Sequence, residues 1–374
     1  MRIRTITCHD CYNHGASLQA YALMHYLKSI GHDTKIIHYR PEYISKYIGL
    51  WVVANERFNK PIIKWIYLLL KFPSRLKSKK RLDKFDDFTA NCLDLTKRYN
   101  SIDELNADPP EADVYIAGSD QIWNTFFPNG RDTAFYLDFG KPEVKRISYA
   151  ASFATPDIVP EYREFVKKKI QNLDACSIRE KTSLPLLRSL GREDGVAVCD
   201  PVFLLNKQEW CDILSTETTV SKLSAATNSE KYILVYLTDR SPQIEKIALE
   251  TKVATGWKIF IVGALFENYA DKCFANAGPW EFVYLIKNAQ FVISNSFHAT
   301  AFSLIMEKKF CVVNRSEGIN ERMKSVLSDF KLEEKLISTF SESLLKDIDY
   351  IEVNQKMGEI IKGSKKWLSQ VLSA

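Results

Sequence analysis

The chain has 374 residues, of which 46% are hydrophobic and 26% are charged, and its formal net charge at pH 7 is +5. This composition is typical of a globular protein and excludes a disordered or collagen-like chain. Because single hydrophobic cores seldom grow beyond ~250 to 300 residues, we expect two domains.

The sequence shows neither an export signal nor a membrane span. Its first residues have no apolar stretch between a basic start and a cleavage site, so we expect a cytoplasmic protein. The longest apolar run, PIIKWIYLLLKF, is about half of the ~20 residues that a spanning helix needs. We expect the eight cysteines to be reduced thiols. The CxxC of Cys8 and Cys11 lacks the second pair of a metal site, so we expect no metal.

The chain opens with a predicted β-α-β unit. RIRTITC alternates apolar and polar residues as a strand does, ASLQAYALMHYLKSI has helical spacing, and TKIIHY is typical of a second strand. Beyond a helical, basic insertion at about 45–95, the strands ADVYIAGSD, RISYAASF, ACSI and VAVCDP alternate with predicted helices. This order predicts an N-terminal parallel α/β domain over residues 1–205.

The insertion joins an apolar segment to a basic one within residues 61–84. In KFPSRLKSKKRLDK, which follows the apolar IIKWIYLLL, Asp83 is the only acid. This pairing could contact an anionic membrane surface, at the inner face of the membrane. The alternative, which we favour, is a buried amphipathic helix followed by a solvated one. We expect no binding to nucleic acid, because no recognition motif accompanies the charges.

A second α/β series is predicted after residue 205. Residues 206–230 are rich in Ser and Thr, so we interpret them as a linker or surface excursion. Strands and helices then alternate from YILVYL to KFCVVN, which makes 206–350 the C-terminal domain. We expect a last helix, 351–374, to pack back on the first domain. Two doubly wound domains side by side would form a ligand cleft between the carboxyl ends of their sheets.

Polar groups follow five of the predicted strands, in YNHGASLQ, GSDQIWN, SIRE, DPVF and SNSFH. The first segment lacks the three glycines of a dinucleotide fingerprint, which argues against NAD. Gly15 could still let the backbone approach a sugar or phosphate, with Asn13 and Gln19 donating hydrogen bonds. The alternative is that Asn13 only caps the helix.

His298 lies where an apolar strand meets an apolar helix. Asn295 or Ser296 would cap that helix and leave N–H groups beside the imidazole, which makes an anion site. A histidine there could bind phosphate and act as a general acid. The alternative is a purely structural histidine.

Two further segments supply candidate side chains. Asp120 could take a proton from a sugar hydroxyl, and Trp123 could stack on a sugar ring. Arg179 suits a carboxylate or a phosphate. Alternatively, Asp120 only caps the following turn, Trp123 fills the core, and Arg179 forms an ion pair with Glu180 or a nearby acid. The remaining candidate binding residues of the turn are Gly118, Ser119 and Gln121.

Taken in order, these segments resemble the polysaccharide pyruvyl transferase family. The resemblance rests on NHGASLQAYAL, GSDQIWN, RISYAASF, SIRE, DPVFLL, EFVYLIKNAQFVISNSFHATAFS and ERMKSVL, and covers roughly residues 1–330. It implies two Rossmann-like doubly wound domains facing a cleft, similar to glycosyltransferase type B, with the acceptor on the first domain and the donor on the second.

The resemblance also implies an activity. Phosphoenolpyruvate, as co-substrate and without a cofactor, would give a pyruvyl ketal to a sugar of a surface polysaccharide or its lipid-linked precursor. His298, Asp120 and Arg179 would then be the catalytic residues. Many members have an arginine two residues before the histidine, where this chain has Ser296, and Arg322 is a candidate replacement. Two other functions stay open, a glycosyltransferase that uses a nucleotide sugar and a noncatalytic glycan-binding relative.

Overall fold

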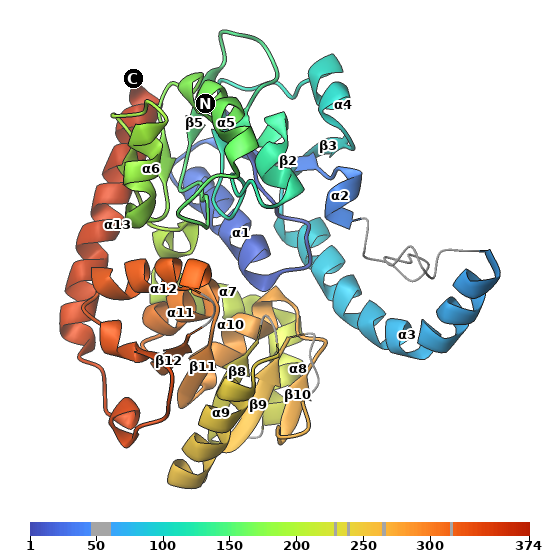
Figure 1. The fold of residues 1–374 in the computed structure, drawn as a ribbon, viewed down its shortest axis with the longest axis vertical. Helices are drawn as coiled ribbons and strands as arrows, with labels where there is room; N and C mark the ends of the chain where they lie inside the picture. The colour runs from blue at the N-terminus through green and yellow to red at the C-terminus, as the bar shows by residue number, and fades with distance from the viewer. Residues whose placement is uncertain (46–60, 228–229, 238–239, 264–266, 315–316) are drawn as a thin grey trace.

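Two parallel β-sheets form the frame of the protein (Figure 1). The computed structural model describes residues 1–45, 61–227, 230–237, 240–263, 267–314 and 317–374. The strands of the first sheet are β1 (Arg2–Ile6), β2 (Asp33–Tyr39), β3 (Leu95–Tyr99), β4 (Val114–Ala117) and β5 (Lys145–Ser148). Those of the second are β8 (Tyr232–Tyr236), β9 (Lys258–Val262), β10 (Lys272–Phe274), β11 (Phe291–Ser294), β12 (Lys309–Val313) and β13 (Leu336–Ile337). A short pair, β6 (Ser177–Ile178) and β7 (Val196–Ala197), lies beside β5.

The helices connect these strands in the alternating order that the sequence predicts. They are α1 (His14–Ser29), α2 (Glu42–Ser45), α3 (Pro61–Cys92), α4 (Ile102–Ala107), α5 (Arg163–Gln171), α6 (Leu184–Ser189), α7 (Lys207–Thr216), α8 (Thr218–Thr227), α9 (Pro242–Thr255), α10 (Pro279–Asn288), α11 (Phe297–Ile305), α12 (Glu317–Asp329) and α13 (Tyr350–Ser373). Every residue of β4, β8 and β11 is buried, as expected of parallel strands with both faces covered. The predicted α/β class is confirmed.

Both sheets have a point where the strand order reverses. The first sheet runs β3-β2-β1-β4-β5, and the second runs β10-β9-β8-β11-β12-β13. In the first sheet, β2 and β3 lie on one side of β1, and β4 and β5 lie on its other side. In the second sheet, β9 and β10 lie on one side of β8, and β11 to β13 lie on its other side. In such sheets, ligands bind beyond the carboxyl ends of the two strands that flank the reversal. The loops after β1, β4, β8 and β11 are therefore the places to look for a site.

An apolar core is shared by the two sheets. One continuous cluster includes side chains from β1, α1 and β4 together with others from β8, α10 and α11. Trp280 lies within it, with ring centroids 5.0 Å from Tyr21, 4.9 Å from Phe88 and 6.4 Å from Trp210. The outer face of each sheet has a separate cluster. The two halves of the chain thus pack against each other through large aromatic side chains.

The last helix, α13, contacts both halves. At its start, the Tyr350 hydroxyl donates to the Lys308 carbonyl at 2.5 Å. Farther along, the Cys199 N–H donates to Ser364 Oγ at 2.9 Å, and Lys145 Nζ donates to the Val371 carbonyl at 2.5 Å. Cys199 and Lys145 belong to the first half of the chain, so α13 returns to it, as Figure 1 shows.

Of the two interpretations of residues 206–230, a linker or a surface excursion, the linker is wrong, because helices α7 and α8 occupy most of this segment. A capping box between Asn206 and Glu209 starts α7, and Trp210 and Leu214 are buried beneath it. Serine and threonine have weak helix propensity, but the cap and the burial of these two side chains favour the helix.

The favoured interpretation of the basic insertion is also wrong. Its apolar segment lies in the first half of α3, where Leu69 is 77% and Leu70 is 74% exposed. Among the side chains of α3 that the structure describes, the buried ones are Phe85, Phe88 and Thr89 in its last turns. Residues 46–60 of the insertion lie outside the described part of the chain. Among the described residues, no helix combines the length and the apolar character needed to cross a bilayer.

Candidate active site

His298 lies in the first turn of α11, directly after the strand-order reversal of the second sheet. Ser296, the N-cap residue, has extended backbone angles and makes no capping hydrogen bond with its side chain. The Ser296 N–H instead donates to Ser294 Oγ at 3.0 Å. The first N–H groups of α11 therefore have no side-chain cap from Ser296. The imidazole is 8% exposed beside them, at the positive end of the helix dipole.

Gly15 lies against the ring of His298. A Cβ atom on Gly15 would be 2.0 Å from His298 Nδ1, so a larger residue cannot occupy this position without displacing the ring. The neighbour of Gly15 is therefore an imidazole, and the approach of a sugar or phosphate to its backbone stays a prediction. The contact between Gly15 and His298 brings the start of α1 and the start of α11 together. Asn13 caps α1 by accepting from the Gly15 and Ala16 N–H groups at 3.0 and 3.2 Å.

A buried carboxylate, Asp200, is the centre of the site. Its Oδ2 accepts hydrogen bonds from Ser119 Oγ at 2.9 Å and from Arg179 Nη1 at 3.0 Å, and lies 3.6 Å from His298 Nε2. Its Oδ1 accepts from the Val202 N–H at 3.1 Å. Burial raises the pKa of Asp200, but His298, Arg179 and this N–H outweigh it and lower the pKa well below its usual value. Asp200 is therefore ionised at neutral pH.

Each of the three nitrogens of the Arg179 guanidinium donates to a protein group. Besides its bond to Asp200, Nε donates to Glu180 Oε1 at 3.0 Å and Nη2 donates to Ser152 Oγ at 3.3 Å. Its Cζ lies 4.3 Å from the centre of the Phe297 ring. Burial lowers the pKa of Arg179, but Glu180 and Asp200 outweigh this and raise it above its usual value. The predicted alternative of an ion pair with Glu180 is confirmed. The guanidinium of Arg179 points toward the carboxylates of Glu180 and Asp200.

Asp120 follows β4 in a strained conformation. Its φ of 76° lies in the left-handed region that favours glycine. Its carboxylate accepts from the Gln121 N–H at 2.9 Å, so the turn-cap alternative is confirmed. Asp120 also contributes to the raised pKa of Arg179, which shows that it lies within the same electrostatic neighbourhood.

The other candidates of this turn have structural partners. Ser119 is fully buried and donates to Asp200. A Cβ on Gly118 would meet Thr7 Cβ at 3.3 Å, so the turn packs tightly on the loop after β1. Gln121 accepts from Asn124 Nδ2 at 3.1 Å.

Trp123 does not line an open site. It is 0% exposed, its Nε1 donates to the Phe135 carbonyl at 3.0 Å, and its ring is parallel to that of Tyr136 at 5.7 Å. The prediction that it stacks on a sugar is wrong, because its indole has no accessible face. Gln19 is likewise buried and donates to Thr7 Oγ1 and the Ala16 carbonyl.

The remaining candidates belong to the second half of the chain. Asn295 is 3% exposed and Ser296 is half-buried. Arg322 falls within α12, but its side chain lies outside the described residues.

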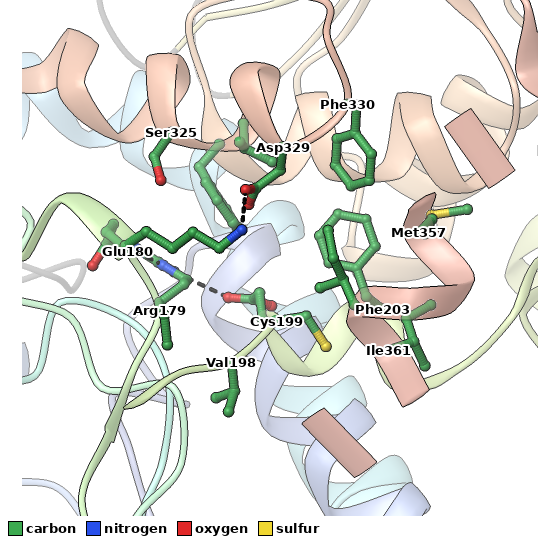
Figure 2. Close-up of a pocket in the computed structure, with 16 residues that line it drawn as sticks. Arg179, Glu180, Val198, Cys199, Phe203, Ser325, Asp329, Phe330, Met357 and Ile361 are labelled. Carbon is green, nitrogen blue, oxygen red and sulfur yellow. Dashed lines mark hydrogen bonds and ion pairs between the residues drawn. The ribbon is translucent and has the colours of Figure 1, made fainter. Parts of the chain in front are cut away.

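A pocket adjoins the engaged arginine. Figure 2 shows Arg179 and Glu180 on one side of it and Phe203, Phe330 and Met357 on the other. Its cavity volume is about 50 Å³, which is smaller than the ~300 to 1,000 Å³ of typical small-molecule sites. The polar group Asp200 and the apolar helices α12 and α13 thus border one concave space.

Sequence reasoning missed the central role of Asp200. The segment DPVF was noted for a polar group after a strand, but no role was given to its carboxylate. Ser152 was missed as a partner of Arg179, although it lies in a noted segment. Among the described residues, no group of His, Cys, Asp and Glu side chains has the arrangement of a metal site.

Comparisons with known structures support the fold described above. The chain is similar to UDP-GlcNAc 2-epimerase from Neisseria meningitidis, with 14% identity, a TM-score of 0.53 and full coverage of both chains. It is also similar to UDP-N-acetylglucosamine 2-epimerase from Rickettsia bellii, with 11% identity, a TM-score of 0.50 and coverage of 100% of this chain and 96% of that one. At such identities the likeness shows the fold alone, which is of the glycosyltransferase B type.

The family follows from a second comparison. The model of the polysaccharide pyruvyl transferase family matches residues 13–317, so the chain belongs to this family and is a transferase. The match contains Gly15, Asp120, Arg179, Asp200 and His298. No curated protein matches the chain.

Proposed function

We propose that this site transfers the pyruvyl group of phosphoenolpyruvate to two hydroxyls of one sugar, in a surface polysaccharide or its lipid-linked precursor. The product is a cyclic ketal, and phosphate is released. The observation that carries the proposal is the meeting of two helix starts, α1 and α11, at His298 and Gly15. Helix N-termini offer N–H donors and partial positive charge, both of which suit a phosphate.

The proposed reaction begins with protonation of the donor. His298, as imidazolium, gives a proton to the methylene carbon, whose π electrons form the new C–H bond and leave the central carbon electrophilic. Asp120 takes the proton of the first sugar hydroxyl as its oxygen bonds to that carbon. The second hydroxyl then bonds to the same carbon while the C–O bond to phosphate breaks, and its proton leaves with the phosphate. Holding both hydroxyls near one carbon favours the second step by ~7 kcal/mol or more.

The buried charges around His298 support its role as an acid. Asp200 is ionised and lies 3.6 Å from His298 Nε2, so a negative charge faces this nitrogen of the ring. Arg179 keeps Asp200 in place and acts through it, which revises its predicted role as a direct ligand. Arg322 stays our proposed ligand for the donor carboxylate, in place of the arginine that Ser296 replaces.

The proposed reaction takes place in the cytoplasm and requires no cofactor, because phosphoenolpyruvate itself carries the transferred group. The remaining predicted binding residues, Asn13 and Asn295, lie in the two loops that flank His298 and are proposed to contact the substrates.

The test is an assay of the purified protein with phosphoenolpyruvate and candidate oligosaccharides, in which phosphate release and ketal formation are measured together. His298→Ala should lower turnover by ~100-fold or more, since general acids contribute that much. His32→Ala is the matched control, because His32 follows the opposite end of α1 and should retain full turnover. Near-normal turnover of His298→Ala would refute the assignment.

The same assay separates the other two functions. Transfer from a nucleotide sugar, with no use of phosphoenolpyruvate, would make the protein a glycosyltransferase. Glycan binding without either reaction would make it a noncatalytic relative.

A further inference from the structure

The first half of α3 carries an apolar stripe and extends away from both sheets (Figure 1). Trp65 is 65% exposed, Leu69 77%, Phe72 39% and Leu76 50%. These residues are four, three and four positions apart, so they share one side of the helix. Soluble proteins seldom leave a continuous apolar stripe exposed unless it has a binding role.

The second half of α3 attaches the helix close to the candidate active site. Phe85 is 2% exposed, Lys84 pairs with Glu281 of α10, and Arg81 Nη2 donates to the Tyr12 carbonyl at 2.7 Å. Tyr12 lies three residues before Gly15, which contacts His298. The exposed stripe therefore has a fixed connection to the start of α1.

The charges along α3 indicate what the stripe contacts. In the sequence, Lys64, Lys71 and Arg75 directly precede Trp65, Phe72 and Leu76. The stripe position after Leu76 is occupied by exposed lysines, Lys79 and Lys80. The only acid between residues 64 and 84, Asp83, pairs with Lys79 at 2.6 Å. An apolar stripe bordered by cations is complementary to an anionic bilayer surface. Protein interfaces, by contrast, are depleted in lysine.

We propose that α3 docks the protein on an anionic membrane surface. Leu69 and Leu76 enter the interface between headgroups and acyl chains, and the exposed Lys79 and Lys80 lie at the level of the lipid phosphates. The helix does not cross the bilayer. Docking would hold the start of α1 near the surface, where a lipid-linked sugar would be presented. This inference concerns where the enzyme works and stands independently of the chemistry proposed above.

The experiment is cosedimentation of the full chain with vesicles. Vesicles of phosphatidylcholine and phosphatidylglycerol should bind the protein, and vesicles of phosphatidylcholine alone should not. High salt should weaken binding, because screening acts on the charge component. The affinity of the double variant Leu69→Glu, Leu76→Glu for the vesicles should be lower by at least about tenfold. Both apolar contacts are replaced by charges that the anionic surface repels.

Matched control variants test whether binding depends on the stripe of α3 or on exposed apolar residues anywhere on the surface. Val253 on α9 is 87% exposed and Ile351 on α13 is 84% exposed, so Val253→Glu and Ile351→Glu should bind like the unchanged protein. Circular dichroism and the urea midpoint should show that all variants are folded, because the changed side chains are exposed.

Three outcomes would overturn the proposal. They are equal binding of the double variant and the unchanged protein, equal binding to neutral and anionic vesicles, and a dimer in sedimentation that the double variant abolishes without lipid. The last would mean that a second copy covers the stripe. Turnover with a water-soluble acceptor should be unchanged in the double variant, and its loss would place α3 in the active site instead.

Discussion

Asp200 joins three loops that are far apart in the sequence. Its Oδ2 accepts hydrogen bonds from Ser119 and Arg179 and lies 3.6 Å from His298 Nε2. A carboxylate with no exposed side-chain surface is stable only if it is paired and hydrogen-bonded. The charge that orients His298 is therefore also a condition for the fold around it.

Asp200→Asn should strongly destabilise the protein. The amide has nearly the same shape but leaves the buried Arg179 with one carboxylate fewer, and breaking a buried pair costs ~3 kcal/mol or more. The free energy of unfolding from urea titration measures this loss. Asp194→Asn is the control, because Asp194 pairs with Arg192 at 2.8 Å but has a 60% exposed side chain, where such pairs contribute ~1 kcal/mol or less. Equal losses for the two variants would contradict our account.

Gly15→Ala should impair the site in spite of the better helix propensity of alanine. The new Cβ would be 2.0 Å from His298 Nδ1, so the ring must leave its present position next to Asp200 Oδ2. We expect turnover to fall by ~10-fold or more, since small displacements of catalytic groups have effects of this size, and stability to fall by ~1–3 kcal/mol.

Gly363→Ala tests the same substitution without the contact. No atom lies within 4 Å of a Cβ at this position of α13. Helix propensity then predicts a gain of ~0.5–1 kcal/mol. If Gly15→Ala is as harmless as Gly363→Ala in turnover and in urea unfolding, the proximity of Gly15 and His298 has no functional role.

The sequence predicted His298 as a site residue because it lies at the start of a predicted helix, where free N–H groups suit an anion, and because of the family resemblance. It did not predict the partners of Asp200, since these depend on which loops the fold brings together. It also could not distinguish Trp123 in the core from Trp123 in a cleft, because both positions follow a buried strand.

Helix α1 also fixes the contact between the two halves through His14. Its Nε2 donates to the Ala277 carbonyl at 3.0 Å, so Nδ1 is free to accept from the Tyr236 hydroxyl, 3.3 Å away. Both bonds suit the neutral imidazole. Burial, with a smaller contribution from Arg81, lowers the pKa of His14 to about 3.

This lowered pKa predicts a loss of stability in acid. Between about pH 6.5 and 3, the unfolded chain binds a proton at His14 that the folded chain does not. The free energy of unfolding should therefore fall as pH decreases, by up to ~1.4 kcal/mol per pH unit from this group. Urea titrations at several pH values measure the slope. In His14→Phe the slope should be smaller, while the same change at half-buried His25 should alter it less. An unchanged slope in His14→Phe would contradict the prediction.

Among the helices, those with clear apolar spacing were predictable. The helices α7 and α8 were not predictable, because serine and threonine have weak helix propensity. The helical structure of α7 depends on the burial of Trp210, which the local sequence does not show. The exposure of α3 was not predictable either, since an apolar stripe has the same spacing whether it packs on a core or lies in solvent.

For the molecule as a whole, alternation of strands and helices was sufficient to predict two doubly wound sheets. The order of motifs was sufficient to indicate the family, which the family model then showed. The extent of the core that joins the two sheets was not predictable, because it depends on aromatic residues such as Tyr21 and Trp280 that are far apart in the chain.

That common core has a consequence for the size of substrate. Separating the sheets would bring Trp210 and Trp280 into water, and α13 connects the sheets along one side. Wide opening and closing of the two halves is therefore disfavoured. With the function proposed above, a long glycan acceptor would reach His298 from the rim, while most of the polymer stays outside.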